Sequence, residues 1–364
     1  MPSTIFLLFR APSSEVLRAP PPAEWASQIR AAVQRLLDAP VAHGSSQTSS
    51  SSSDGASSRL VVLFALDASA ERLKYNLAFS HLDAFLQWAY GQAWSVAVER
   101  DALLFNVDVL LVPGASKEVV GRVLERESGS STQDQDGTEA NGDLLLLAEQ
   151  EVLDAFAPPS WKTESIPPTP KTAGSFMSIQ VCLPQYPVVA LGGTFDHLHA
   201  GHKILLSAAS ALTTRKLIIG ITSDEMLRSK AEAGLLESIE RRKERVERFV
   251  RAFSAAWREA EGQGAVEIDA VTLRDVAGPA GTETDLQALV LTQETLSGGA
   301  FIADVREKNG LGALDQHVIS VLGAKGETGL GGQGGETDAK QLAAAKVGST
   351  AIRKWLAAKE GPKA

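Results

Sequence analysis

The sequence predicts an α/β protein with a Rossmann-like doubly wound parallel sheet in its C-terminal domain and a second α/β region before it. Short apolar runs rich in branched residues recur along the chain, as expected of buried parallel strands. Segments with apolar residues at helical spacing lie between these runs, and such alternation is typical of strand-helix-strand units. A proline-rich stretch separates two such sets, and the length of 364 residues also favours two domains.

The N-terminal region, residues 1–156, contains three predicted strands at 5–9, 60–66 and 107–113. Between them, apolar residues recur at helical spacing from Trp25 to Leu36 and from Leu82 to Ala89. Two low-complexity insertions, 43–58 and 127–143, have almost no apolar residues to bury, so we expect neither to pack. The region has no recognisable chemical motif, and its role cannot be read from the sequence.

Residues 157–180 are rich in proline and predict an extended linker, followed by the C-terminal domain at 181–364. This domain alternates predicted strands with predicted helices at 202–212 and about 237–260. The predicted strands cover 188–191, 216–222, 266–273, 286–292 and 317–323. A glycine-rich insertion at 323–340 is predicted to be flexible, and a last helix follows Ser349 and Thr350, which are good N-cap residue types.

Composition excludes several classes of protein. The formal net charge of -9 leaves no basic stripe for coating nucleic acid, although a local phosphate pocket stays open. Cys182 is the only cysteine, so we expect no disulfide, no cysteine-based zinc site and a reducing compartment. We expect this compartment to be the cytoplasm, with the nucleus as an additional location. No apolar run reaches the ~18 residues of a membrane span. Arg10 and Arg18 leave organelle targeting as an alternative.

The stretch VVALGGTFDHLHAGHKILL, residues 188–206, concentrates the chemistry of the chain. Gly192 and Gly193 lack a Cβ, so a phosphate could approach their backbone closely. The helix that follows offers free N–H groups and a positive end, which together form an anion site. His199 and His202 are three residues apart and share one side of its first turn. The combination suits a polyphosphate. Asp196 could orient a neighbouring group or serve only the turn.

Residues 192–206 resemble the signature of the HIGH-type nucleotidylyltransferases, and more narrowly the phosphopantetheine adenylyltransferases of the eukaryotic and archaeal type. The likeness continues through GITSDEMLRSK (220–230), LRDVAGPAGTETDLQALVLTQETLSGG (273–299), VREKNGL (305–311) and KVGSTAIRKWL (346–356). It covers about residues 186–358 in family order. The resemblance therefore implies a Rossmann-like adenylyltransferase domain.

The resemblance also implies an activity and a set of residues. The adenylyl group of ATP would pass to 4′-phosphopantetheine, giving dephospho-coenzyme A and pyrophosphate, with Mg²⁺ held mostly by phosphate oxygens and water. The implied catalytic residues are His202, Lys230 and Thr194. The implied ATP-binding residues are Gly192, Gly193, His199, His202, Ser349, Thr350 and Arg353. The implied residues for the second substrate are Thr194, Lys230, Arg242 and Arg306. Association with other enzymes of coenzyme A biosynthesis would fit the same family.

Two alternatives remain at the level of sequence, and a third is disfavoured. Another acceptor, such as nicotinamide mononucleotide or an alcohol phosphate, would use the same scaffold. A non-catalytic nucleotide-binding or scaffolding protein would suit the unassigned N-terminal region. A dehydrogenase is disfavoured, because no G-x-G-x-x-G follows a predicted strand.

Overall fold

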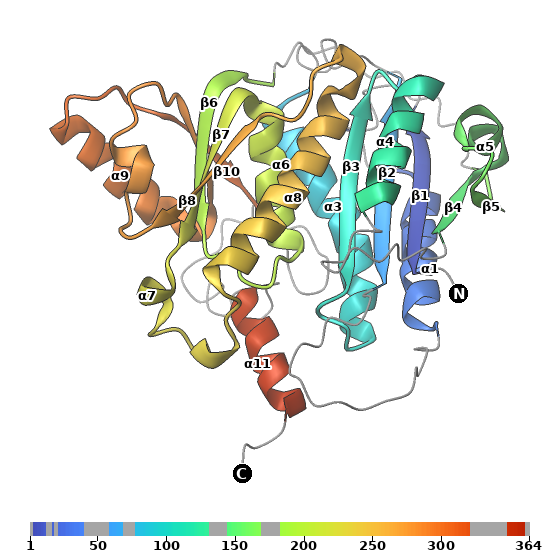
Figure 1. The fold of residues 1–364 in the computed structure, drawn as a ribbon, viewed down its shortest axis with the longest axis horizontal. Coiled ribbons are helices and arrows are strands. Elements are labelled where there is room, and N and C mark those ends of the chain that lie inside the picture. The colour runs from blue at the N-terminus through green and yellow to red at the C-terminus, as the bar shows by residue number, and fades with distance from the viewer. Residues whose placement is uncertain are drawn as a thin grey trace.

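The computed structural model describes residues 3–11, 17, 21–39, 58–67, 77–130, 144–168, 183–320 and 348–360. It contains two five-stranded sheets, each with helices beside it (Figure 1). The glycine-rich stretch 323–340 lies outside the described residues, as does almost all of the two predicted insertions. None of the described helices combines the length and the apolar character that a bilayer span requires.

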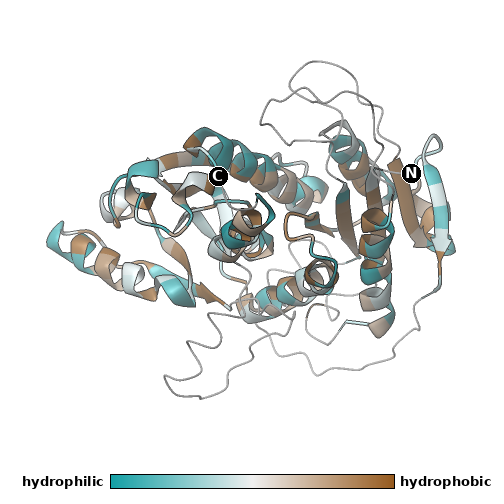
Figure 2. Ribbon diagram, turned by 90° about the horizontal axis from the view of Figure 1, so that it is seen from below, coloured by the Kyte–Doolittle hydropathy of each residue, from teal (hydrophilic) through white to brown (hydrophobic). Residues whose placement is uncertain are grey.

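The first sheet has the strand order β3-β2-β1-β4-β5, and all of its neighbouring strands are parallel. Its strands are β1 (Thr4–Ala11), β2 (Arg59–Leu66), β3 (Asn106–Pro113), β4 (Leu144–Glu149) and β5 (Lys162–Ile166). The first three match the predicted apolar runs and are almost entirely buried. Figure 2 shows these strands as strongly hydrophobic and the edge strand β5 as hydrophilic.

The helices of the first half are α1 (Ala23–Leu37), α3 (Phe79–Glu99), α4 (Lys117–Ser130) and α5 (Gln150–Phe156). Helices α1 and α3 pack on each other, and so do α4 and α5. The prediction that residues 127–143 cannot pack is wrong at its start, because α4 continues to Ser130. Glu127 is buried there, and its carboxylate pairs with Arg59.

Part of the predicted proline-rich linker, residues 157–180, is a strand of the first sheet. Residues 162–166 form β5, which pairs in parallel with β4, and Trp161 packs against Phe6 with ring centroids 4.9 Å apart. Strand β5 has few apolar residues and is mostly exposed, so its own sequence carries no strand signal. The first half therefore extends at least to residue 166, beyond the predicted boundary at 156.

The second sheet has the order β10-β9-β6-β7-β8 and is also parallel throughout. Its strands are β6 (Tyr186–Gly193), β7 (Thr213–Thr222), β8 (Glu267–Leu273), β9 (Ala288–Thr292) and β10 (Asp315–Ile319). Its helices are α6 (Ala200–Leu212), α7 (Asp224–Leu227), α8 (Ile239–Arg258), α9 (Leu296–Lys308) and α11 (Ser349–Glu360). Short 3₁₀ turns include η2 (Ala233–Leu235), η3 (Glu259–Glu261) and η4 (Gly278–Gly281).

Helices cover both faces of the second sheet, which confirms the doubly wound prediction. Val189 and Leu191 of β6 belong to the core that contains α6 and α8. Val188 and Ala190 belong to a smaller cluster on the other face, together with Ile302 of α9. Helix α9 starts at Leu296 and includes Gly298 and Gly299, a stretch to which the sequence analysis assigned no helix.

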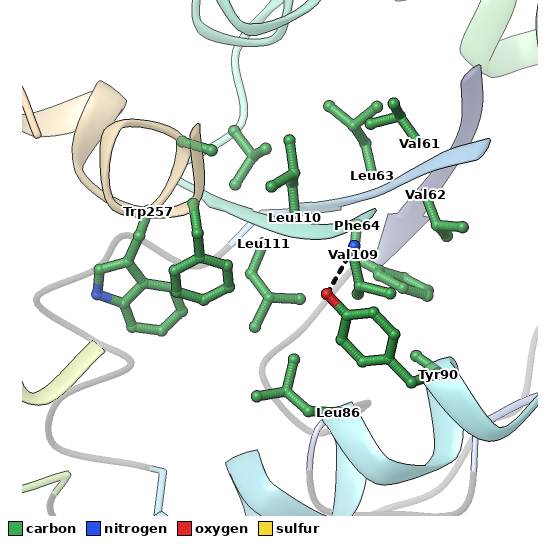
Figure 3. Close-up of a cluster of buried hydrophobic side chains, with 14 of the residues drawn as sticks. Val61, Val62, Leu63, Phe64, Leu86, Tyr90, Val109, Leu110, Leu111 and Trp257 are labelled. Carbon is green, nitrogen blue, oxygen red and sulfur yellow. Dashed lines mark hydrogen bonds between the residues drawn. The ribbon is translucent and has the colours of Figure 1, made fainter. Parts of the chain in front are cut away.

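The two halves share one core, whereas the sequence suggested two. A single cluster of buried apolar residues runs from β1 to β10 through α3, α6 and α8. Figure 3 shows Trp257 of α8 beside Leu110 and Leu111 of β3. Strand β3 is the edge of its sheet, and α8 packs against it. Covering this edge with a helix protects backbone groups that would otherwise be open to pairing with another strand.

Candidate functional site

The candidate site begins where β6 ends at Gly193 and α6 starts at Ala200. The intervening turn is tight, because Phe195 and His197 both adopt left-handed backbone conformations, with φ of 52° and 46°. A Cβ on Gly193 would lie 3.0 Å from the Phe195 ring, which is closer than ordinary contact. Glycine at this position therefore allows the phenylalanine to fold under the turn, where it is fully buried.

His199 and His202, here called the histidine pair, stack on each other at the start of α6. Their ring centroids are 3.8 Å apart with an interplanar angle of 21°. Both residues are partly exposed, but the Nδ1 atom of each is buried and has no hydrogen-bond partner within the described residues. The His202 ring also packs on Phe195 at 5.1 Å. The predicted proximity of the two histidines is thus a direct ring contact.

Burial controls the protonation of the histidine pair. Burial, together with smaller contributions from the charges of His197 and Lys203, lowers the pKa of His199 to about 3. Burial and the neighbouring histidines likewise hold the pKa of His202 well below its ordinary value. Both rings are therefore neutral at pH 7 in the unliganded protein, and each has one N–H to donate.

Asp196 ties the turn to two distant parts of the chain. It is fully buried, and its Oδ1 accepts the backbone N–H of Glu237 at 2.9 Å. Its Oδ2 accepts a hydrogen bond from Arg353 Nη1 at 2.5 Å, and its backbone carbonyl accepts one from Ser349 Oγ at 2.8 Å. Of the two interpretations open for Asp196, the structure supports the orienting one: this side chain docks α11 onto the turn.

The docking of α11 brings some of the predicted ATP-binding residues to the histidines. Ser349 Oγ lies 3.5 Å from His199 Nε2, although 150 positions separate them in sequence. Thr350 is exposed beside it. Arg353 is buried, and its donors are directed to Asp196, the Ala231 carbonyl and Thr350 Oγ1. Arg353 thus anchors the helix.

Arg242 lies at the carboxyl ends of two strands instead of in open space. The side chain is fully buried, and Nη1 donates to the carbonyls of Thr194 and Thr222 at 2.7 and 2.8 Å. Nε donates to the Glu237 carbonyl, and Nη2 pairs with Asp224. Arg242 thereby fixes the ends of β6 and β7, and direct contact with a substrate would require one of these bonds to break.

The remaining predicted residues are dispersed. Lys230 follows α7 and is exposed. The carbonyl of the next residue, Ala231, accepts a hydrogen bond from Arg353, so this part of the chain contacts α11. Thr194 is partly exposed next to Gly193. Arg306 of α9 is 2% exposed and donates to the carbonyls of Ala280, Glu283 and Gly312. Because α9 covers the face of the sheet opposite α6, the structure does not bring Arg306 to the histidines.

Two charged residues of the site region were not predicted from sequence. Glu237 accepts the His197 backbone N–H at 2.8 Å and pairs with Arg241 and Arg245 on α8. Lys203, directly after His202, is 4% exposed, and its ammonium points into the first half of the chain. Lys203 could have been found from the sequence, because it is a lysine within an otherwise apolar helix face.

The residues Asp196, His197 and Glu237 lie close enough together to be considered as metal ligands. Their oxygens are already used, however. Asp196 accepts from Arg353 and from the Glu237 N–H, and the Glu237 carboxylate faces two arginines and the His197 N–H. These contacts balance both carboxylates without a cation, so the cluster fits a structural network better than a metal centre.

A cavity of about 700 Å³ adjoins the site between the two halves of the chain. One wall comes from residues 103–108 of the first half, and another from residues 197–200 at the start of α6. Arg241, Arg245 and Arg248 of α8 line a third side. The first half therefore contributes surface within reach of the histidine pair.

Comparison with known proteins identifies relatives of the second half. Residues 190–353 match the family of cytidylyltransferase-like proteins. A phosphopantetheine adenylyltransferase of Saccharomyces cerevisiae is 36% identical over 178 residues, which cover 49% of this chain and 51% of that protein. The chain thus spans about half the length of this relative. A phosphopantetheine adenylyltransferase of Thermococcus kodakarensis is 33% identical over 38% of this chain and 77% of its own length.

A solved structure from Archaeoglobus fulgidus, of a protein with unknown function, is 31% identical. It covers 36% of this chain and 87% of its own, with a TM-score of 0.30.

Proposed function

Because this chain belongs to the phosphopantetheine adenylyltransferases of the eukaryotic and archaeal type, we propose that it transfers the adenylyl group of ATP to 4′-phosphopantetheine. The products would be dephospho-coenzyme A and pyrophosphate. The observation that carries the proposal is the stacked, neutral histidine pair at the start of α6, with Ser349 of α11 3.5 Å from His199. This arrangement provides side-chain donors beside the free N–H groups of a helix N-terminus, where a triphosphate would be stabilised.

The proposed chemistry requires alignment more than activation. The attacking group is a phosphate dianion, which is already a nucleophile near neutral pH, so no covalent enzyme intermediate is needed. The histidine pair would donate to the phosphates as negative charge moves onto the leaving pyrophosphate. Thr194 and Lys230 would hold the acceptor phosphate near the α-phosphorus, and Ser349 and Thr350 would hold the β- and γ-phosphates.

Mg²⁺ would enter with ATP as part of the substrate. Phosphate oxygens and water commonly supply most of its ligands in such sites. The carboxylates of Asp196 and Glu237 are occupied by arginines and backbone N–H groups, which supports a metal held by ATP rather than by the protein.

The site residues divide into two proposed groups. The Gly192–Gly193 backbone, the histidine pair and Ser349 would contact ATP. Arg353 and Arg242 would act by holding α11 and the strand ends in place, since their donors are directed to protein oxygens. We also propose the cytoplasm as the compartment, for which the single cysteine is the support.

The test measures pyrophosphate release by the full chain with MgATP and one of three acceptors: 4′-phosphopantetheine, nicotinamide mononucleotide or an alcohol phosphate. We expect release with the first. His202→Asn should lower kcat by about 10²–10³-fold, the loss typical for one donor to developing charge. His317→Asn is the matched control, because His317 lies in β10 against Phe79 and Tyr186, and kcat should stay unchanged. Preference for another acceptor would correct the substrate, and no release with any acceptor would refute the proposal.

A further inference from the structure

The first half of the chain repeats the topology of the second without its chemistry. The second sheet, written from its other edge, has the order β8-β7-β6-β9-β10, and the first has β3-β2-β1-β4-β5. In each, the first strand in sequence lies at the centre. The histidine motif follows β6, whereas the chain after β1 reads PSSEVLRAP, with neither glycines nor histidines. The first half also lies outside residues 190–353, which match the family. Its role must therefore differ from a second copy of the same reaction.

Lys203 connects this first half to the helix that bears the histidines. Its Nζ donates to Asn106 Oδ1 at 2.7 Å, to the Val107 carbonyl at 2.7 Å and to Asp108 Oδ1 at 2.6 Å. An ammonium has three N–H groups, so all of its donors are used. All three acceptors lie at the start of β3.

The contact belongs to a buried network with no net charge. Asp108 also accepts from Arg59 Nε at 2.8 Å, and Arg59 Nη2 pairs with Glu127 at 2.9 Å. Burial alone would raise the pKa of Asp108, but the charges of Lys203 and Arg59 hold it well below its ordinary value. Two cations and two anions thus compensate each other, which a buried set of charges requires.

The geometry of β3 explains why the connection is specific. At the outer edge of a sheet, alternate backbone groups have no strand partner. Tyr90 satisfies the Val109 N–H, and its hydroxyl accepts at 3.1 Å (Figure 3). Lys203 satisfies the Val107 carbonyl on the same edge. A shift of α6 along or around its axis would leave this carbonyl unpaired in the interior and the Asp108 carboxylate with Arg59 as its remaining partner.

Lys203 is also coupled directly to the histidines. It follows His202 in the first turn of α6, and its backbone N–H donates to the His199 carbonyl at 3.0 Å. The first half makes a second contact with the site through Asp101, which pairs with Trp355 and Lys359 of α11. Both helices of the proposed phosphate site are thus held by the first half of the chain.

We propose that Lys203 is a positioning residue, and that its pairing with Asp108 lets the first half of the chain set the orientation of the histidine pair. The inference rests on the proposed function for its kinetic readout. The first half is then a rigid partner of the catalytic helix.

The experiment compares full-length Lys203→Met, Asp108→Asn and the double variant. Each single change leaves one charge uncompensated and should lower the thermal midpoint. The double variant restores neutrality and should fold with a midpoint nearer to that of the unmodified protein. Its kcat should nevertheless fall about 10- to 100-fold, because misplacing a catalytic group by about 1 Å costs on that order. Its KM for ATP should change by less than about threefold, because ground-state binding is shared by many groups.

A readout independent of activity is the NMR titration of the imidazole nitrogens. Burial is the main cause of the lowered His199 pKa and the Lys203 charge is a smaller one, so the double variant should raise this pKa, and by more if the ring also becomes exposed. In a folded variant, a purely structural Lys203 would leave kcat unchanged, and the titration would shift only by the loss of the Lys203 charge; that result would overturn the proposal. Asn106→Ala, which removes one neutral acceptor, should move both quantities less but in the same direction.

Glu259→Gln provides the control. Glu259 in η3 pairs with Arg122 and Arg126 of α4, so this variant breaks a connection between the halves that includes neither Lys203 nor Asp108, although Arg126 also lies 3.9 Å from Glu127. Unchanged kcat and imidazole titration are expected. An equal loss in this variant would overturn the proposal by showing that any loosening of the halves suffices. If the unmodified protein transferred no adenylyl group, the proposed function would fail, and the imidazole titration alone would decide the role of Lys203.

Discussion

Replacing Asp196 with asparagine should undock α11 from the site. The side chain pairs with Arg353, and both residues are at most 2% exposed. Asparagine keeps the volume and can still accept the Glu237 N–H, but its NH₂ group would face the donors of Arg353. Removing one partner of a buried ion pair typically costs about 3–5 kcal/mol, because the other charge stays buried without compensation.

The size of this loss, compared with the other contacts of α11, determines whether only α11 detaches. Besides Arg353, the described contacts of α11 with the rest of the protein include Ile352, which is 1% exposed, and the partly exposed links of Trp355 and Lys359 to Asp101. Burying one isoleucine contributes about 1.5–3 kcal/mol, and the exposed links to Asp101 add little because solvent screens them. The loss therefore equals or exceeds what the rest of the helix contributes, so α11 should detach while the two sheets stay folded.

Hydrogen exchange of the α11 amides and ATP affinity by calorimetry measure the effect. We expect fast hydrogen exchange in α11. The apparent ATP affinity should fall in proportion to the fraction of molecules in which α11 remains docked, a decrease of up to about 100-fold or more. Asp285→Asn is the matched control, because it removes the same charge from a surface pair with Arg215 that is about half exposed. Slow α11 exchange and unchanged ATP affinity in Asp196→Asn would refute the reasoning.

Three further predictions concern stability. The free energy of unfolding without ligand should decline as pH falls from about 6.5 toward 3, because histidines of the unfolded chain bind protons that the buried histidine pair does not. Urea titrations between about pH 7 and pH 4 measure this decline. A flat profile in that window would contradict the prediction. Gly193→Ala should lower the free energy of unfolding by about 1–3 kcal/mol, because its Cβ would lie 3.0 Å from a phenylalanine ring. Gly192→Ala meets only ordinary contacts at 3.5 Å and should lower it less. Equal thermal midpoints of the two variants would count against this prediction. Arg242→Met should lower the free energy of unfolding in urea by roughly 3–5 kcal/mol, because it leaves the Thr194 and Thr222 carbonyls unpaired. A higher KM for the acceptor with unchanged stability would instead identify Arg242 as a residue that binds the substrate.

Much of the fold follows from local patterns. The runs at 5–9, 60–66 and 107–113 became β1, β2 and β3, because a strand buried on both faces must be apolar throughout. The elements that were not predicted lack such a pattern. Strand β5 has the sequence KTESI and exists because β4 offers it backbone partners. Helix α9 has Gly298 and Gly299 in its first turn and is stabilised by packing Ile302 against the sheet.

The sequence by itself determined the glycine turn, the helix start and the two histidines three residues apart, because each depends only on neighbours in the chain. Tertiary structure decided the rest of the site. Ser349 reaches His199 across 150 positions, and Arg242 and Arg306 are held inside by carbonyl oxygens from distant segments. It also decided that Lys203 joins the two halves. A charge becomes buried, and therefore needs a partner, only when chain segments far apart in sequence pack together, and local spacing carries no record of that partner.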